Sequence, residues 1–497
     1  MPLLCKYIRK MVYPPAGNTK ANCKQAERRC DFNMRIFNTL SGTKEEFVPI
    51  SEGKASIYAC GPTVYDYFHI GNARPFIIFD TLRRYLEYQG YQVTFVQNFT
   101  DIDDKMIRRA NQEGITVAEL GERFIAEYKK DAQGLGIRPA SVHPRATQHI
   151  PQIIQMIETL EKQGFAYEVD GDVYFRTKKC KDYGKLSHQP LEDLEAGARI
   201  SVDERKEDAM DFAVWKKQKE GEPAWDSPWG MGRPGWHIEC SVMANQYLGK
   251  TIDIHCGGRD LIFPHHENEI AQSECCNGVP FAHYWMHNGY INIDNKKMSK
   301  STGNFFTVRD IAKEFDYPVI RMFMLSAHYR SPINFSKDLM RQAKASLERI
   351  ETCINALTFL QQGQDASLTQ QEQALMETDY TARFEAAMDD DLNTADALSV
   401  VFDMVRDINT LINDGQPHSH QMTTHFLSQF NVYSQVLGLF GQKKDEALED
   451  EIAALIQQRQ QARKAKNFQE ADRIRDLLKE QGILLEDTPQ GVKWKRE

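Results

Sequence analysis

Four residues near the start of the chain have the composition of a phosphate-binding turn. His69-Ile70-Gly71-Asn72 lies directly before a segment with helical periodicity. Backbone N–H groups and the helix dipole at such a position favour anions, so the turn suits a nucleotide phosphate. His69 and Asn72 add side-chain donors, and Gly71 lets a purine ring approach the backbone. Taken alone, these residues would equally fit an ordinary helix N-cap with an incidental histidine.

A second polar motif begins 225 residues after Asn72. Lys297-Met298-Ser299-Lys300-Ser301 brings two lysines and two hydroxyls together in a loop that can reach around a triphosphate. Charge grows on the α-phosphate as a carboxylate attacks it, and ammonium groups stabilise that charge without covalent chemistry. The pairing of the two motifs therefore indicates a site that activates a carboxylic acid with ATP.

A third set of residues has the character of metal ligands. Cys60 ends the first predicted strand, and Cys240 lies in the segment GWHIEC. His265 and Glu269 are four residues apart, so a helix beginning near Pro264 would present both on one face. Two thiolates, an imidazole and a carboxylate make a suitable zinc shell. Four neighbouring residues compete for these places: His255, Cys256, His266 and Glu267.

These residues need an α/β framework to bring them together. Ser56–Cys60 and Tyr91–Asn98 are predicted strands, and Ala73–Gln89 between them is a predicted helix that Gly90 stops. Strand, helix, strand is the unit of a parallel sheet, whose ligands bind at the carboxyl ends of the strands. The fold class is thus α/β, with a Rossmann-like parallel-sheet catalytic domain.

The rest of the chain divides by composition. Turn residues and charges mark an inserted connective domain, whereas apolar stripes at three- and four-residue spacing after about Pro332 predict an α-helical bundle, followed by a small C-terminal module. The predicted parts are an N-terminal extension that is disordered or not native (1–33), the first half of the catalytic domain (34–135), the insertion (136–228), the second half (229–296), the KMSKS loop and junction (297–335), the bundle (336–440) and the C-terminal module (441–497).

Charge is uneven along the chain, although the net charge is −9. Residues 459–479 hold seven Lys/Arg against three acids, a local balance of +4, so the C-terminal end could hold RNA or could simply be a solvated surface. No apolar run approaches the roughly 20 residues that span a bilayer. We expect a cytoplasmic protein without a membrane partner, whose ten cysteines are reduced thiols.

The two nucleotide motifs resemble the signatures of class I aminoacyl-tRNA synthetases, although Asn72 stands where those enzymes usually have histidine. CGPTVYD–HIGN, GWHIEC and FPHHENE resemble the zinc-binding segments of cysteinyl-tRNA synthetases, and the resemblance runs from about Met34 to Glu497. It implies one zinc per chain on Cys60, Cys240, His265 and Glu269. The substrate thiolate would bind this zinc, which selects sulfur over the serine hydroxyl.

The resemblance also implies roles in the nucleotide and amino-acid pockets. The catalytic residues would be His69, Asn72, Lys297 and Lys300. Gly71, Lys300 and Ser301 would bind ATP, which acts as substrate with magnesium, and three further residues would line the pocket: Thr100, Trp236 and Asp260. The implied reaction forms cysteinyl-adenylate and then transfers cysteine to the terminal adenosine of tRNA(Cys). The expected partners are tRNA(Cys), L-cysteine and ATP, and we expect a monomer.

Three other functions were weighed. Cysteine ligases of mycothiol synthesis share most of the motifs but lack a full anticodon-binding end; this chain carries both the helical bundle and the basic module Gln457–Glu497, which favours tRNA. A zinc hydrolase would explain the H-H-E-x-E cluster, but the chain has no HExxH order and a hydrolase leaves KMSKS unexplained. A non-enzymatic zinc- and RNA-binding protein would need no complete KMSKS loop.

Overall fold

The structure of this chain is a computed structural model that describes residues 33–188, 205–293, 296–297, 306–440, 446–480, 482–488 and 491–496. These residues form two compact units. One unit runs as far as Met340 and also includes Glu385–Ala397, and the other comprises Arg341–Phe384 and the chain from Leu398 onward. The predicted N-terminal extension, apart from Asn33, and residues 298–301 of KMSKS lie outside the described residues.

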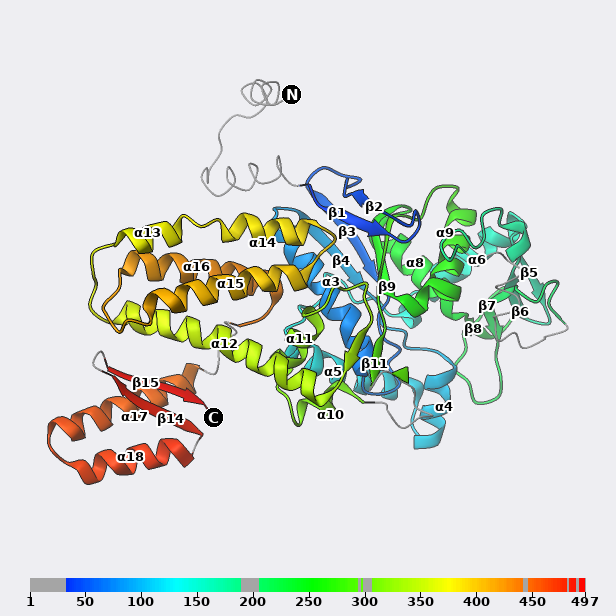
Figure 1. Cartoon of the computed structure of the whole chain (residues 1–497). Helices are drawn as coiled ribbons and strands as arrows, with labels where there is room; N and C mark the ends of the chain where they lie inside the picture. Colours follow the sequence, from blue (N-terminus) through cyan, green and yellow to red (C-terminus); the bar gives the residue numbers. More distant parts are fainter. Residues whose placement is uncertain are drawn as a thin grey trace, which may run out of the picture. The chain divides into compact units, whose positions relative to one another are not determined.

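The centre of the first unit is a four-stranded parallel sheet in the order β10-β9-β3-β4 (Figure 1). Its strands are β3 (Lys54–Ala59), β4 (Gln92–Gln97), β9 (Ile252–Gly258) and β10 (Ala282–Asn288). The chain leaves β3 for β4 on one side and returns to β9 on the other, so β3 marks a topological switch point at which ligands bind. The predicted α/β class with a parallel sheet is confirmed.

The helix after β3 starts earlier than its sequence pattern predicts. α3 spans Ile70–Tyr88, with His69 in an extended conformation as its N-cap, whereas we predicted a helix from Ala73. Ile70, Gly71 and Asn72 therefore form the first turn of α3 and not a loop. The helical periodicity was visible only from Ala73 because Gly71 and Asn72 are half-buried polar positions without an apolar side chain.

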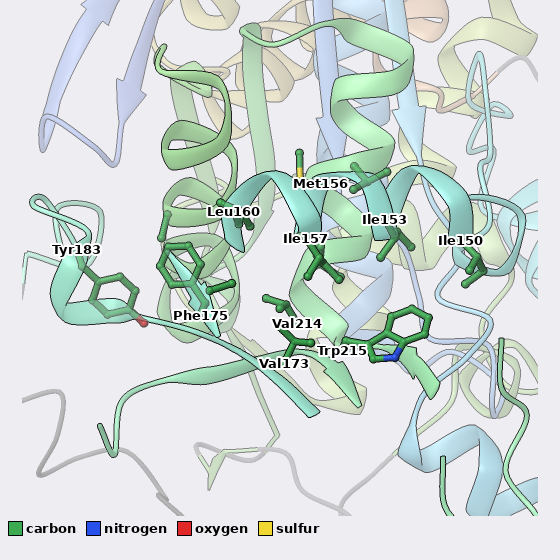
Figure 2. Close-up of a cluster of buried hydrophobic side chains, with 14 of the residues drawn as sticks. Ile150, Ile153, Met156, Ile157, Leu160, Val173, Phe175, Tyr183, Val214 and Trp215 are labelled. Carbon is green, nitrogen blue, oxygen red and sulfur yellow. The ribbon is translucent and has the colours of Figure 1, made fainter. Parts of the chain in front are cut away.

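An antiparallel sheet, β5-β6-β7-β8, lies within the first unit. Its strands are β5 (Ala166–Val169), β6 (Asp172–Phe175), β7 (Phe212–Lys217) and β8 (Gly232–Pro234), and α6 (Ile150–Lys162) precedes it. Ile153 and Ile157 project from α6 toward side chains of β6 and β7 such as Val173 and Val214 (Figure 2), and Ile150, Met156 and Leu160 belong to the same apolar cluster.

This apolar cluster also holds the helices that carry the candidate metal ligands. Ile238 and Val242 belong to α8 (Trp236–Leu248), and Ala271 belongs to α9 (Glu267–Asn277). All three side chains are buried in the same cluster as α6. Removing a buried Ile side chain from a core costs about 2–5 kcal/mol, so the cluster fixes both helices relative to α6 and the antiparallel sheet.

The first unit contains further helices and short strands. They are β1 (Arg35–Asn38), β2 (Thr43–Glu46), α4 (Asp104–Glu113), α5 (Val117–Gly134), β11 (Ile291–Ile293), β12 (Lys296–Lys297), α10 (Val308–Ala312), α11 (Tyr317–Leu325) and β13 (Ile333–Phe335). The later part is helical, as predicted: α12 (Lys337–Gln362), α13 (Gln370–Met376), α14 (Tyr380–Asp389), α15 (Thr394–Ile412) and α16 (His420–Leu437). Predicted stripe residues such as Leu347, Ile350 and Ile408 are buried.

The C-terminal segment consists of α17 (Glu446–Lys464), α18 (Phe468–Glu480) and the hairpin β14 (Ile483–Thr488) and β15 (Gly491–Arg496). Its small core contains Ile452, Ile474, Leu478 and Ile483. The sequence pattern predicts an apolar face through Phe468, Ala471, Ile474 and Leu477–Leu478 and a basic face that includes Arg459, and two residues differ from it. Phe468 is 62% exposed and does not extend the apolar face of α18, and Arg459 is only 5% exposed and does not belong to the outer basic face.

Candidate active site and metal centre

The four residues predicted as metal ligands come together at the carboxyl end of the central sheet. One ligand atom from each of Cys60, Cys240, His265 and Glu269 lies within 4.8 Å of the others. Cys60 follows β3, and Cys240 lies on α8. His265 lies in the π-helical turn Ile262–His266, which directly precedes α9, and Glu269 lies in the first turn of α9. His265 Nε2 lies 3.0 Å from Glu269 Oε1, and the Cys60 thiol donates to the same oxygen at 3.5 Å. A single ion could reach all four atoms.

A second group of possible ligands overlaps the first. Cys60, His255, His266 and Glu269 also lie within 4.8 Å of one another. His266 Nε2 is 3.3 Å from the Cys60 sulfur, and His255 Nε2 is 2.8 Å from Glu269 Oε2. The two groups share Cys60 and Glu269, so an ion in one position excludes an ion in the other. The first group offers two sulfur donors, which are the softer ligands and favour zinc.

The other two competitors are occupied elsewhere. The Glu267 carboxylate accepts backbone N–H groups of Gly184 at 2.9 Å and of Ser187 at 2.9 Å, and it thereby fixes the chain segment after β6 to the start of α9. The Cys256 thiol donates to the Tyr58 carbonyl at 3.4 Å. Burial raises the pKa of Cys256 well above its ordinary value, so it stays a thiol.

The electrostatics of the first group suit cation binding. The hydrogen bond from Cys60 lowers the pKa of Cys240 to about 6, against the effect of burial. Burial alone would raise the pKa of Glu269, but His255 and His265 outweigh it and lower that pKa to about 2. Burial alone would lower the pKa of His265, but Glu269 and Cys240 raise it to about 10. At neutral pH the metal-free cluster therefore holds a thiolate and a carboxylate, with an imidazolium between them.

Two orienting histidines were not identified from the sequence. His237 Nδ1 lies 2.8 Å from His265 Nδ1, and His287 Nε2 lies 2.8 Å from His266 Nδ1. A partner on the far ring nitrogen fixes which nitrogen faces a metal. His237 stands in the same GWHIEC segment as Cys240, which is a signal that could have found it. His287 comes from β10, and only the register of the sheet brings it here.

The first nucleotide motif is fastened to the chain that follows the second. Ile70 N donates to Phe306 O at 3.1 Å, and Val308 N donates to Phe68 O at 3.2 Å, around an antiparallel bridge between His69 and Thr307. At the other end of the loop, Lys297 pairs with Asn292 in β12 and β11. Lys300 and Ser301 lie outside the described residues, but both ends of their segment are held by strand pairing within the first unit.

The remaining predicted pocket residues have different surroundings. Thr100 is buried after β4, where its N–H donates to Pro62 O at 3.2 Å. Trp236 is 42% exposed, and its ring stacks on His265 with 4.3 Å between centroids. Asp260 is exposed in the short turn Arg259–Leu261. Trp236 thus lies beside the metal cluster, Thr100 pairs with Pro62 shortly after Cys60, and Asp260 lies on the segment between β9 and His265.

Comparisons with known proteins agree with this fold and site. Three protein-family models match the chain. The model described as "tRNA synthetases class I (C) catalytic domain" matches residues 46–345, the "DALR domain" model matches 383–441, and the "Cysteinyl-tRNA ligase anticodon binding domain" model matches 445–494. A solved methionyl-tRNA synthetase of Mycobacterium tuberculosis, in complex with methionyl-adenylate, shares the fold at a TM-score of 0.58 and 15% identity, covering 77% of this chain and 89% of that one. The fold and site are those of a class I aminoacyl-tRNA synthetase.

Curated relatives narrow the class. The cysteine–tRNA ligase of Clostridioides difficile (strain 630) is 58% identical over 466 residues, which cover 93% of this chain and 100% of that protein. The cysteine–tRNA ligase of Caldicellulosiruptor saccharolyticus is 58% identical over 467 residues, with the same coverage. The chain belongs to the cysteine–tRNA ligase family. Among the helices in its described part, none is both long and apolar enough to cross a membrane.

Proposed function

We propose that this chain activates L-cysteine with ATP and transfers it to tRNA(Cys), using one zinc ion held by Cys60, Cys240, His265 and Glu269. The observation that carries the proposal is the convergence of these four ligand atoms within 4.8 Å of one another. When bound, zinc would supply a soft acceptor for the substrate thiolate, which a serine hydroxyl cannot match. A pocket that relied on shape alone would discriminate cysteine from serine by only ~10–200-fold.

The nucleotide half of the proposal rests on the pairing of the first motif with residues 306–308, which follow the second motif. His69 and Asn72 lie at the N-terminus of α3, where donors and the helix dipole favour the phosphates of ATP. Lys297 and Lys300 would stabilise charge on the α-phosphate, Gly71 and Ser301 would complete the nucleotide site, and magnesium would accompany ATP. The pairing of Phe68–Ile70 with Phe306–Val308 keeps the end of the KMSKS segment beside this turn.

The pocket for the amino acid would lie between these two regions. Trp236 supports this position because its ring stacks on His265; Thr100, which bonds Pro62 shortly after Cys60, and Asp260 would complete the lining. We propose that the enzyme acts as a monomer in the cytoplasm. The match of residues 445–494 to an anticodon-binding domain supports tRNA as the acceptor, in preference to the amino sugar used by the ligases of mycothiol synthesis.

Charging assays test the choice of acceptor. The zinc-loaded chain should attach labelled cysteine to total tRNA in an ATP-dependent reaction, and it should not couple cysteine to a glucosamine-inositol acceptor. Cysteine activation without any tRNA charging would contradict the proposed function and favour the sugar ligase. Absence of both activities would favour the non-enzymatic alternative.

A further inference from the structure

Glu239 is a buried carboxyl group without a hydrogen-bond partner. It lies in the first turn of α8, directly before Cys240, and its side chain is 0% exposed. Among the described residues, it is the only buried carboxyl group for which neither oxygen has a partner. Burying an unsatisfied polar group costs free energy, and a group that stays so in a folded protein requires an explanation.

The charged groups with the largest effect on Glu239 are acidic. Burial, followed by the charges of Cys240, Asp101 and Asp103, raises the pKa of Glu239 well above its ordinary value, and the Thr100 hydroxyl lies beside it. Asp101 is already bonded to Thr147 through both oxygens, at 3.0 Å and 2.5 Å, and the Asp103 carboxylate caps α4 through Met106 N at 2.7 Å. Glu239 is therefore the acidic group in this region that is still free to accept from a cation.

The chemistry of the substrate requires an acceptor in this region. If the thiol of free cysteine binds at Cys60 and Cys240, its ammonium nitrogen is three covalent bonds away and lies within about 4 Å of the sulfur. An ammonium group removed from water needs a paired anion or several acceptors. The other buried atoms without a partner near the cluster are the Tyr58 hydroxyl, His255 Nδ1 and Gln272 Nε2, and none of them is anionic.

We propose that Glu239 binds the α-ammonium group of the amino-acid substrate, so that two consecutive residues of α8 read its thiol and its amine. The inference rests on the proposed function and adds a second element of selection to it. Cys240 and the metal distinguish sulfur from oxygen. Glu239 distinguishes a free amine from an absent or acylated one, and so excludes thiols such as N-acetylcysteine, glutathione and 3-mercaptopropionate.

Binding measurements with matched thiols test this role. L-cysteine and 3-mercaptopropionate share a thiol and a carboxylate and differ in the amine. We would titrate the zinc-loaded full chain calorimetrically in a thiol-free reductant. The wild-type protein should bind cysteine with a Kd at least about tenfold lower than that for 3-mercaptopropionate. Glu239→Gln keeps the shape of the side chain but removes the carboxyl group that would pair with the ammonium group. It should weaken cysteine binding by about 10- to 100-fold, as expected for a charged hydrogen bond, and change 3-mercaptopropionate binding by less than about threefold.

Controls separate binding from folding. Glu274→Gln removes a half-buried carboxylate of α9 that is paired with Lys185, and it should leave the affinity for both thiols unchanged. Zinc content and the unfolding midpoint should be unaltered in Glu239→Gln. If that variant does not fold, the same titrations are made with Glu239→Asp, and the affinities of the wild-type protein for cysteine and N-acetylcysteine are compared.

The outcomes are distinguishable. A selective loss of cysteine binding supports the role of Glu239. An equal loss for both thiols, no loss for either, or a wild-type protein that binds both thiols equally well overturns it while leaving the proposed function intact. A zinc-loaded wild-type protein that binds neither thiol contradicts the proposed function itself.

Discussion

The Sγ atoms of Cys60 and Cys240 lie 4.0 Å apart, although 180 residues separate the two cysteines in the sequence. Two thiolates on one tetrahedral zinc ion, each with a Zn–S distance of about 2.3 Å, would be ~3.8 Å apart. The separation fits joint ligation of one ion. It is also well beyond the ~2.05 Å of a disulfide bond. The end of β3 and the helix α8 pack in one hydrophobic cluster, which includes Tyr58 and Cys240 and against which Cys60 packs.

Removal of one sulfur ligand should affect metal binding and amino-acid binding together. We expect Cys240→Ser to lower zinc affinity by at least about tenfold and to impair cysteine activation in parallel, because a hydroxyl is a poorer zinc ligand than a thiolate. Zinc content after dialysis and cysteine-dependent pyrophosphate exchange measure the two effects. Cys256→Ser is the matched control, since that buried thiol belongs to neither ligand group.

The same assay decides between the two ligand groups. His265→Asn should release more zinc than His255→Asn if the ion is bound with Cys240. Full retention of zinc and normal cysteine affinity in Cys240→Ser would rule out the assignment of this ligand.

Zinc binding should release protons. In the metal-free protein at pH 8, burial keeps the pKa of Cys60 well above its ordinary value, and the raised pKa of His265 keeps it an imidazolium. Cys240 and Glu269 are already ionised, because their pKa values are lowered to about 6 and about 2. Ligation by all four groups therefore displaces about two protons. Affinity should rise about 100-fold per pH unit between about pH 7 and 9, and fall more steeply below about pH 6, where Cys240 also takes up a proton.

Calorimetry in buffers of different ionisation enthalpy counts these protons. In the second ligand group, burial lowers the pKa of His266 well below its ordinary value, so that ring is uncharged and releases no proton. A zinc affinity that does not change between pH 7 and 9 would contradict the first assignment.

Lys300 should act on the transition state more than on bound ATP. Lys300→Ala should reduce the rate of cysteine activation by about two orders of magnitude, which is ~3 kcal/mol, while changing ATP affinity far less. Single-turnover adenylate formation and equilibrium ATP binding measure the two quantities separately. Lys313→Ala, which removes an exposed lysine paired with Asp310 on α10, serves as the control. An activation rate within threefold of wild type would defeat this role for Lys300.

The C-terminal segment should be needed for charging but not for activation. Deletion of residues 441–497 should leave cysteine-dependent pyrophosphate exchange largely intact, because the described ligands and the α3 turn belong to the first unit. tRNA charging should fall severely, and tRNA binding should depend less steeply on salt, because fewer phosphate contacts release fewer counterions. A folded truncated protein that charges tRNA at the normal rate would show that this segment does not read the anticodon.

Much of the fold was predictable because its signals are local. Apolar strands and helical stripes with polar breaks gave the parallel sheet and the later helices, and short motifs gave the ligands Cys60, Cys240, His265 and Glu269. The early start of α3 was missed because Gly71 and Asn72 carry no apolar pattern. Phe468 was assigned to the apolar face of α18 by spacing alone, although it is the first residue of the helix and extends beyond the small core.

The supporting residues of the site depend on contacts between distant segments. His287 lies opposite Gly257 in the register of β10 and β9, and this pairing brings its ring to His266. The lack of a hydrogen-bond partner for both oxygens of Glu239 is apparent only in the folded structure, where the position of every neighbouring donor is known. No spacing within one segment encodes either relationship, because both result from the packing of α8, α9 and the central sheet.

The most direct test of the account is amino-acid-dependent ATP–pyrophosphate exchange, measured with cysteine and with serine, on the zinc-loaded and the metal-stripped full chain. We expect rapid exchange with cysteine that is lost when the metal is removed and restored when zinc is added. Exchange with serine should be slower by far more than the ~10–200-fold that a pocket selecting by shape alone allows. Undiminished cysteine exchange in a fully metal-free protein, or comparable exchange with serine, would contradict the account.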